Sequence, residues 1–132
     1  MARSLVQLTN TGTQAVAADG IISPGAIQRR FGCNCNSLGN SVQIDGVGYY
    51  EIDGTVTVEP TAIGTVTVQV YRDGAPLPGV LGSVYAATAA QPVTIPLVGT
   101  ARIIAPGAAV LTLVLTAGAG DVTNVSLRVS KF

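Results

Sequence analysis

The chain contains no histidine and no tryptophan. Without histidine, the commonest general base and metal ligand is missing, and neither a Ser-His nor a Cys-His nucleophile pair can form within one chain. Glu51 and Asp53 share one face of an expected strand, where they could form an acid/base or cation-binding pair. A solvated or interfacial strand face is the simpler interpretation. We therefore predict a protein that is not an enzyme and needs no cofactor, with a metal-dependent enzyme built on the few carboxylates as one alternative.

Charged residues are also scarce. Seven Lys and Arg balance seven Asp and Glu, so no basic surface is expected of the kind that binds nucleic acid or an anionic membrane. With 11% charged, 5% aromatic and 48% hydrophobic residues, polar side chains are too few to cover a small isolated domain. Such a domain would expose apolar patches, which usually mark partner surfaces. We therefore expect an oligomer. The alternative is an apolar sandwich with much Ala, Gly and Thr at its surface.

Long apolar runs are absent as well. The longest, residues 108–115, is too short to span a bilayer and is interrupted by Thr112. It is typical of a buried strand, in which Leu111, Leu113 and Leu115 point to one side, into the core. The first residues pass into a polar segment without the apolar run of a secretory signal. We expect a protein made in a cytoplasm and without a membrane partner.

Only two cysteines are present, Cys33 and Cys35. On an extended strand this spacing places both thiols on one face, where a disulfide between them would be strained. The pair also supplies just two of the four ligands that a structural zinc site needs. Two reduced, partly buried side chains are the simpler expectation. The alternative is that symmetry-related copies bring several thiols together near an oligomer axis, for cross-linking or metal capture.

Alternation is what the sequence has in abundance. Residues 50–58 and 65–71 alternate β-branched with other residues, which predicts strands with one buried face. The dipeptide Asp73-Gly74 then predicts a hairpin, because both residues tolerate the positive φ of the tight turn that matches strand twist. No long segment has helical periodicity. The residues expected on the buried side of the first strand are Tyr50, Ile52 and Val56.

Further strands are expected between clusters of Gly, Pro, Asn and Asp. Pro96 lies inside one of them, which makes that segment an edge or bulged strand. The chain is thus predicted to be a single all-β domain over 1–132, with irregular N-terminal strands over 1–41 and core hairpins over 42–132. The clearer strands are expected at 42–44, 49–58, 65–71, 80–86, 93–98, 110–116 and 122–129.

Residues 42–52 carry a recognisable pattern. Val42-x-Ile44, a turn and then Gly48-x-Tyr50-x-Ile52 resemble the signature of the tumour-necrosis-factor superfamily and the related complement globular-head domain. Residues 68–79 resemble the next strand and hairpin of such domains, and residues 124–132 their closing strand. These domains are two-sheet antiparallel jelly-roll sandwiches that assemble as threefold trimers. The resemblance therefore implies that fold and a homotrimer. The residues that we expect at its interface are Tyr49, Cys33, Cys35 and Phe132.

The sequence shows neither the collagen-like stalk nor the membrane anchor of other members, and it is similar to short stand-alone bacterial and bacteriophage forms. We predict a non-enzymatic structural virion protein, made in the bacterial host cytoplasm, that decorates or stabilises the capsid or forms a head fibre. Its partner would be a capsid or other virion protein. The alternative is a trimeric binding module that recognises a host-surface glycan or protein. The four tyrosines lie in or beside expected strands, which favours the structural hypothesis.

Overall fold

The computed structural model describes residues 3–131. These residues form twelve strands. The same residues contain no helix that is long and apolar enough to cross a membrane. In chain order the strands are β1 (Ser4–Asn10), β2 (Gln14–Val16), β3 (Gly20–Ile22), β4 (Ala26–Phe31), β5 (Cys35–Ser37), β6 (Val42–Asp45), β7 (Gly48–Pro60), β8 (Gly64–Arg72), β9 (Ala75–Ala86), β10 (Val93–Ile103), β11 (Ala108–Ala117) and β12 (Gly120–Lys131).

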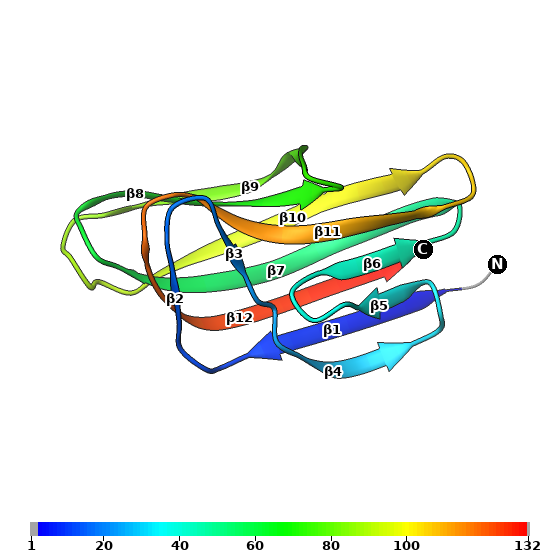
Figure 1. The fold of residues 1–132 in the computed structure, drawn as a ribbon, viewed down its shortest axis with the longest axis horizontal. Helices are drawn as coiled ribbons and strands as arrows, with labels where there is room; N and C mark the ends of the chain where they lie inside the picture. Colours follow the sequence, from blue (N-terminus) through cyan, green and yellow to red (C-terminus); the bar gives the residue numbers. More distant parts are fainter. Residues whose placement is uncertain (1–2, 132) are drawn as a thin grey trace.

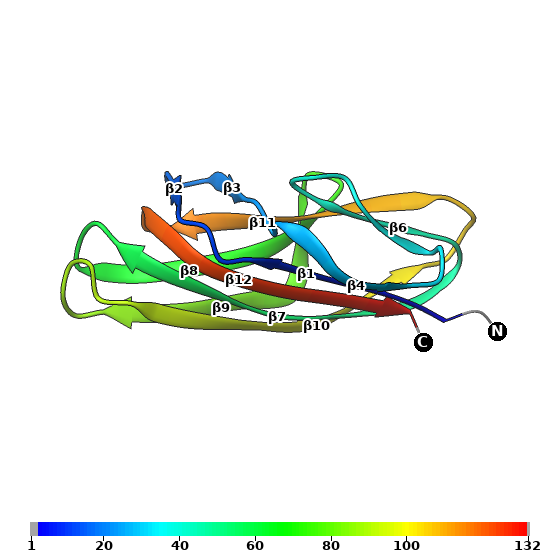
Figure 2. The ribbon, with the colours of Figure 1, turned by 90° about the horizontal axis from the view of Figure 1, so that it is seen from below.

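The strands form two antiparallel sheets that pack face to face (Figure 1). Sheet A has the order β10-β7-β12-β1-β4, with β2 added beside β12. Sheet B has the order β5-β6-β11-β8-β9, with β3 added beside β11. Figure 2 shows the two layers, with β6 and β11 in one and β1, β7 and β12 in the other. From β6 onward, every connection except the β8–β9 hairpin crosses between the sheets. The predicted all-β, two-sheet jelly roll is confirmed.

The hairpin between β8 and β9 turns at Asp73-Gly74, as predicted. Arg72 pairs with Ala75, so the loop has two residues, and their φ angles are 51° and 83°. Both are positive, as the tight turn that matches strand twist requires. The Asp73 amide donates to the Val110 carbonyl at 2.9 Å, and Asp73 Oδ1 accepts from the Val110 amide at 2.9 Å. The turn is therefore fixed against β11.

One hydrophobic core lies between the sheets, because every second side chain of the long strands points inward. The burial pattern of β7 alternates from Tyr50 to Pro60. Tyr50 is the largest fully buried side chain among the described residues, with 0% of its surface exposed. β11 supplies the facing positions from sheet B. The six residues predicted for the core all lie in this cluster: Tyr50, Ile52, Val56, Leu111, Leu113 and Leu115.

β10 is an edge strand of sheet A, as the proline within it predicted. It lies beside β9, the edge strand of sheet B, and the two close one side of the sandwich. A Cβ atom at Gly82 of β9 would stand 2.5 Å from the Pro96 carbonyl oxygen, so the approach requires glycine. Pro76 and Pro78 lie inside β9, since an edge strand tolerates residues that lack a backbone donor.

The first 41 residues contribute strands to both sheets. β1 lies between β12 and β4, and its first residue, Ser4, pairs with Lys131 at the end of β12. The beginning of β1 and the end of β12 thus share one end of the sandwich, which we call the terminal end (Figure 1). In sheet B, β6 pairs with β11 as far as Leu111 and β3 pairs with it from Leu113. The sheet is therefore interrupted beside Thr112.

Candidate interaction surface

The outer face of sheet A carries charges of both signs. Glu51 and Asp53 alternate with the core positions of β7 and point outward. Asp53 lies opposite Arg128 of β12. Farther across the sheet in the same register lie Gln7 of β1 and then Arg29 of β4. Arg128 Nη2 and Asp53 Oδ2 are 2.8 Å apart, and they form the one ion pair in the described part of the chain. Acidic residues thus lie on β7 and basic residues toward β4.

β4 is an unusually exposed strand. All six of its residues are exposed, among them Ile27 at 44% and Phe31 at 62%. β4 pairs with β1, and no strand within residues 3–131 pairs with its other edge. At the opposite edge of sheet A, Val98 of β10 is 65% exposed. Free strand edges and uncovered apolar side chains are typical of partner surfaces. Sheet A has such side chains at both edges.

A shallow hollow of about 330 Å³ lies near the terminal end of this face. Leu5 and Phe31, which are neighbours in the β1–β4 register, form its apolar part. Arg3 and Lys131 make no ion pair with any described carboxylate. The hollow is therefore apolar with a basic rim. Its lining residues are Arg3, Ser4, Leu5, Phe31, Arg128, Ser130 and Lys131.

The two cysteines do not share a face. Cys33 is exposed and Cys35 is buried, and both thiols are free. The prediction of a common face is wrong because the chain bends between β4 and β5, where Gly32 has a φ of 77°. Burial raises the pKa of the Cys35 thiol to about 11. Cys35 is therefore a protonated, unreactive core residue at neutral pH.

A hydrogen-bond network ties this bend to the β6–β7 turn. The Asn34 amide donates to Ser4 Oγ at 2.9 Å, and Asn34 Nδ2 donates to the Asp45 carbonyl at 2.6 Å. The Tyr50 hydroxyl donates to the same Asp45 carbonyl at 2.6 Å and to the Gly46 carbonyl at 2.9 Å. Burial is the main reason that the pKa of Tyr50 rises to about 12. Tyr50 thus fills the core and also holds the turn.

The outer face of sheet B is uncharged over its centre. Strands β3, β8, β9 and β11 contain one charged residue, Arg72, at the end of β8. Hydroxyl groups project from β8 and β9, where Thr67 Oγ1 lies 2.7 Å from Ser83 Oγ. Tyr85 is 63% exposed and lies opposite Thr65. This face offers hydroxyl groups and an exposed aromatic ring without charge.

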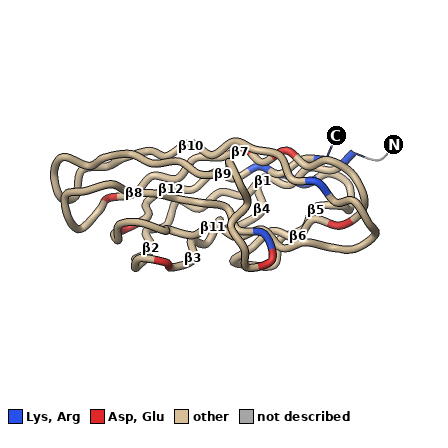
Figure 3. Tube along the Cα trace, turned by 90° about the horizontal axis from the view of Figure 1, so that it is seen from above, with Lys and Arg blue, Asp and Glu red and all other residues tan. Residues whose placement is uncertain are grey.

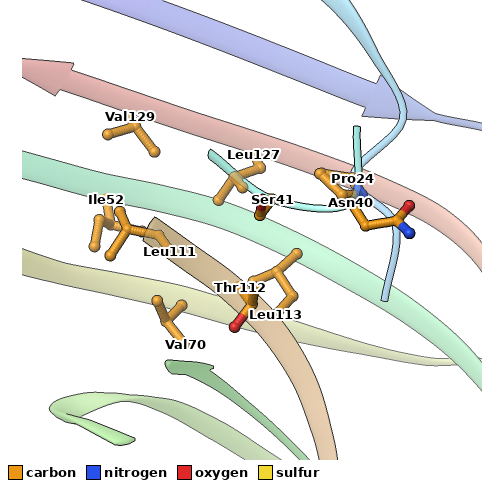
Figure 4. A pocket seen from close by; sticks show the side chains of 10 residues that line it. All are labelled: Pro24, Asn40, Ser41, Ile52, Val70, Leu111, Thr112, Leu113, Leu127 and Val129. Atoms are coloured by element: carbon orange, nitrogen blue, oxygen red, sulfur yellow. The ribbon is translucent and has the colours of Figure 1, made fainter. Parts of the chain in front are cut away.

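A narrow cavity enters the core where sheet B is interrupted beside Thr112 (Figure 4). Its volume is about 10 Å³, which is the space of roughly one water molecule, and its walls are mainly apolar. It is too small for an organic ligand. Residues from both sheets and two loops line it: Pro24, Asn40, Ser41, Ile52, Val70, Leu111, Thr112, Leu113, Leu127 and Val129.

The carboxylates do not gather into a metal centre. No three His, Cys, Asp or Glu side chains within residues 3–131 are placed to hold an ion. Glu51 and Asp53 share the outer face of β7, as predicted, but the Asp53 carboxylate is paired with Arg128. This arrangement fits the solvated or interfacial strand face better than an acid/base pair.

Tyr49 lies on the outer face of sheet A near the terminal end, where it is 46% exposed. Its ring stacks with Arg102, whose guanidinium carbon is 5.1 Å from the ring centroid. Cys33 is exposed beside the end of β4, whereas Cys35 presents no surface to a partner. Phe132, the fourth residue expected at an interface, lies outside the described residues.

Sequence reasoning missed the exposed apolar edges of sheet A. The exposure of Val98 could have been predicted from the sequence, because in the alternating pattern of β10 it falls on the outward-facing positions. β4 gave no such signal, since its exposure depends on β1 lying between it and the rest of the sheet. The inward-facing residues of β10 that precede Val98 are Val93, Ile95 and Leu97.

No family model matches the sequence, and no curated protein is similar to it. Several solved structures are similar in fold. Murine APRIL is 14% identical, with 99% of this chain and 100% of that chain covered at a TM-score of 0.76. The globular domain of zebrafish complement 1qA protein is 7% identical, with 97% and 94% covered at a TM-score of 0.67. PRD1 vertex protein P5 is 13% identical, with 96% and 94% covered at a TM-score of 0.55.

These likenesses concern the fold alone, because the sequence identities are low. The chain has the jelly roll that tumour-necrosis-factor-like proteins share with complement globular heads. The resemblance predicted from residues 42–52 is confirmed at the level of the fold.

Proposed function

We propose that the chain is a homotrimeric, non-enzymatic structural protein of a bacteriophage particle, which decorates or stabilises the capsid surface or forms a head fibre. The observation that carries the proposal is the outer face of sheet A. The exposed edge strand β4 borders this face, and the apolar side chains of Phe31 and Val98 are uncovered at the two edges of the sheet. Covering such a face with a second copy removes apolar surface from water.

The charges of this face give the contact a direction. Arg29 on β4 and Glu51 on β7 each lack an ion-pair partner within the described chain. Arg29 of one copy therefore complements Glu51 on β7 of the next, and Phe31 and Val98 meet between the two copies. A head-to-tail contact of this kind closes into a ring when the rotation fits. The resemblance of residues 42–52 and the likeness in fold support a ring of three.

Tyr49 and Cys33 border this face, and we include both in the proposed interface. Tyr49 lies at its terminal end and Cys33 beside β4. Three Cys33 thiols could meet only if the β4 ends converge on the axis. Cys35 takes no part because it is buried.

The virion assignment draws on the likeness to a protein named as a vertex protein. It also draws on the chemistry of the chain, because the sequence has no histidine and no set of three metal-ligating side chains gathers within residues 3–131. A trimer that engages repeated capsid sites gains strong attachment from modest single contacts, since later contacts form at high effective concentration. Function in this proposal depends on shape and contact.

The test is binding of the purified protein to phage particles assembled without its gene, imaged by electron microscopy. We expect saturable binding and a regular lattice of trimers. Val98→Lys should disrupt the trimer and lower particle binding with it, whereas Tyr85→Lys, a matched change on sheet B, should leave the trimer intact. Absence of saturable binding to particles would overturn the virion assignment.

A second candidate is recognition of an uncharged host-surface glycan by sheet B. Hydroxyl groups and the exposed ring of Tyr85, on a face without charge, favour it. Tyrosine rings stack on sugars through an apolar face and a polar edge. Calorimetric titration with neutral host glycans decides between the candidates. Saturable binding that Tyr85→Ala abolishes, with no affinity for particles, would favour this second function.

A further inference from the structure

The outer face of sheet B points away from the proposed trimer contact. The two sheets pack face to face, so their outer faces look in opposite directions (Figure 2). A ring of copies that closes through the outer face of sheet A therefore leaves the outer face of sheet B on the outside of the ring. This face stays accessible to a further partner when the trimer has formed.

Apolar side chains cross this face in one row of the strand register. Leu81 of β9 lies opposite Gln69 of β8, and Gln69 lies opposite Val114 of β11. Val114 in turn lies opposite Ile21 of β3. Leu81 is 49% exposed and Ile21 is 55% exposed, at the two ends of the row. Tyr85, which is 63% exposed, points to the same side as Leu81, because an even number of positions separates them along β9.

No charge interrupts this row. The charged residues nearest to it along the chain lie where the strands end, with Arg72 and Asp73 at the β8–β9 turn and Asp19 just before β3. In Figure 3 the traces of β8, β9 and β11 are accordingly tan between their ends. The hydroxyl groups of Thr67 and Ser83 lie 2.7 Å apart and bond to each other. The face therefore presents apolar side chains, with few polar groups that need a partner.

We propose that the row from Leu81 to Ile21, together with Tyr85, is the docking site for an uncharged, apolar surface of a virion protein. An ammonium or carboxylate pressed against this row would lose its hydration and find no opposite charge, so the face selects against charged partners. A sugar would bury many hydroxyl groups and find few partners for them. The inference rests on the proposed function, since it names the face through which the trimer meets the particle.

The test is sedimentation of the purified protein with phage particles assembled without its gene. We expect saturable binding that changes little as salt rises, because no charges meet at the contact. Leu81→Lys and Ile21→Lys should each stay trimeric by light scattering and weaken particle binding about tenfold, because a charge would be buried without a partner.

Ile104→Lys is the matched control and should bind particles as the unmodified protein does. Ile104 is 74% exposed, so the same charge is added at an exposed apolar position. It follows the end of β10, whereas β9 approaches that strand at Pro96, near its beginning. Ile104 therefore lies away from the row on sheet B.

Undiminished binding by Leu81→Lys and Ile21→Lys would overturn the docking site and leave the virion assignment in place. Binding that is lost as salt rises, or that Ile104→Lys weakens equally, would overturn it as well. So would a neutral host glycan that binds this face and competes with particles, or a mass above that of a trimer, which would make a second copy the occupant. Failure of the unmodified protein to bind particles is a separate outcome, which would overturn the virion assignment and the docking site with it.

Discussion

Truncation of Tyr50 to alanine probes the core and the terminal end together. The side chain is fully buried, and its hydroxyl lies 2.6 Å from the Asp45 carbonyl and 2.9 Å from the Gly46 carbonyl. Replacement of a buried aromatic residue by alanine costs about 3–5 kcal/mol of the free energy of unfolding. That is a large share of the roughly 5–15 kcal/mol that stabilises a domain of this size.

Tyr50→Phe separates packing from hydrogen bonding. The ring stays, while the hydroxyl donor is lost. The Asp45 carbonyl keeps its bond from Asn34 Nδ2 at 2.6 Å, so the loss falls mainly on the Gly46 carbonyl. We expect a cost of about 1 kcal/mol, the usual net value of one hydrogen bond. The alanine variant should therefore lose several times more stability than the phenylalanine variant.

Urea unfolding followed by circular dichroism measures both costs, at one fixed protein concentration because oligomers make the midpoint concentration-dependent. Tyr85→Ala on sheet B is the matched control, because Tyr85 is 63% exposed. Its midpoint should move little. A Tyr50→Ala midpoint as little changed as that of Tyr85→Ala would refute the inward direction of β7. Equal losses in the Ala and Phe variants would refute the division between packing and hydrogen bonding.

Three further predictions concern the core and its borders. Burial raises the pKa of Cys35 from 9.0 to about 11 and that of Tyr50 from 10.0 to about 12, so both stabilise the fold in their neutral form. Stability should hold below about pH 9 and fall as the pH rises toward 12; urea midpoints measured against pH should show this, and Tyr50→Phe should remove the upper part of the fall. Maleimide should label Cys33 rapidly in the native protein and Cys35 only after unfolding; equal rates by mass spectrometry would refute the bend at Gly32. Gly54→Ala should cost about 1–3 kcal/mol in urea unfolding, because its Cβ would stand 2.5 Å from the Ser126 carbonyl oxygen; an unchanged midpoint would contradict the close approach of β7 and β12.

Alternation identified the long strands because it records which face of a strand is buried. The inward direction of Tyr50, Ile52 and Val56 could therefore be predicted, and the dipeptide Asp73-Gly74 predicted the hairpin turn. The bend between Cys33 and Cys35 was not readable, because it depends on Gly32 adopting a positive φ beside Ser4 of another strand.

The candidate surfaces depend on contacts between distant parts of the chain. Arg128 pairs with Asp53 although 75 positions separate them, and Arg72 bonds to the Arg102 carbonyl across 30 positions. No local pattern in the sequence encodes such neighbours. Composition nevertheless predicted an interaction surface, because charged residues make up only 11% of the chain. Proposing that this surface is the outer face of sheet A required the strand order.

The trimer is the central claim, and its mass in solution tests it most directly. Light scattering on the purified chain at micromolar concentration in neutral buffer should give three times the mass of one chain, which is 13.3 kDa. Val98→Lys should reduce this mass toward that of one chain, because it places a charge at the uncovered edge of sheet A. A mass of 13.3 kDa for the unmodified protein would contradict the account.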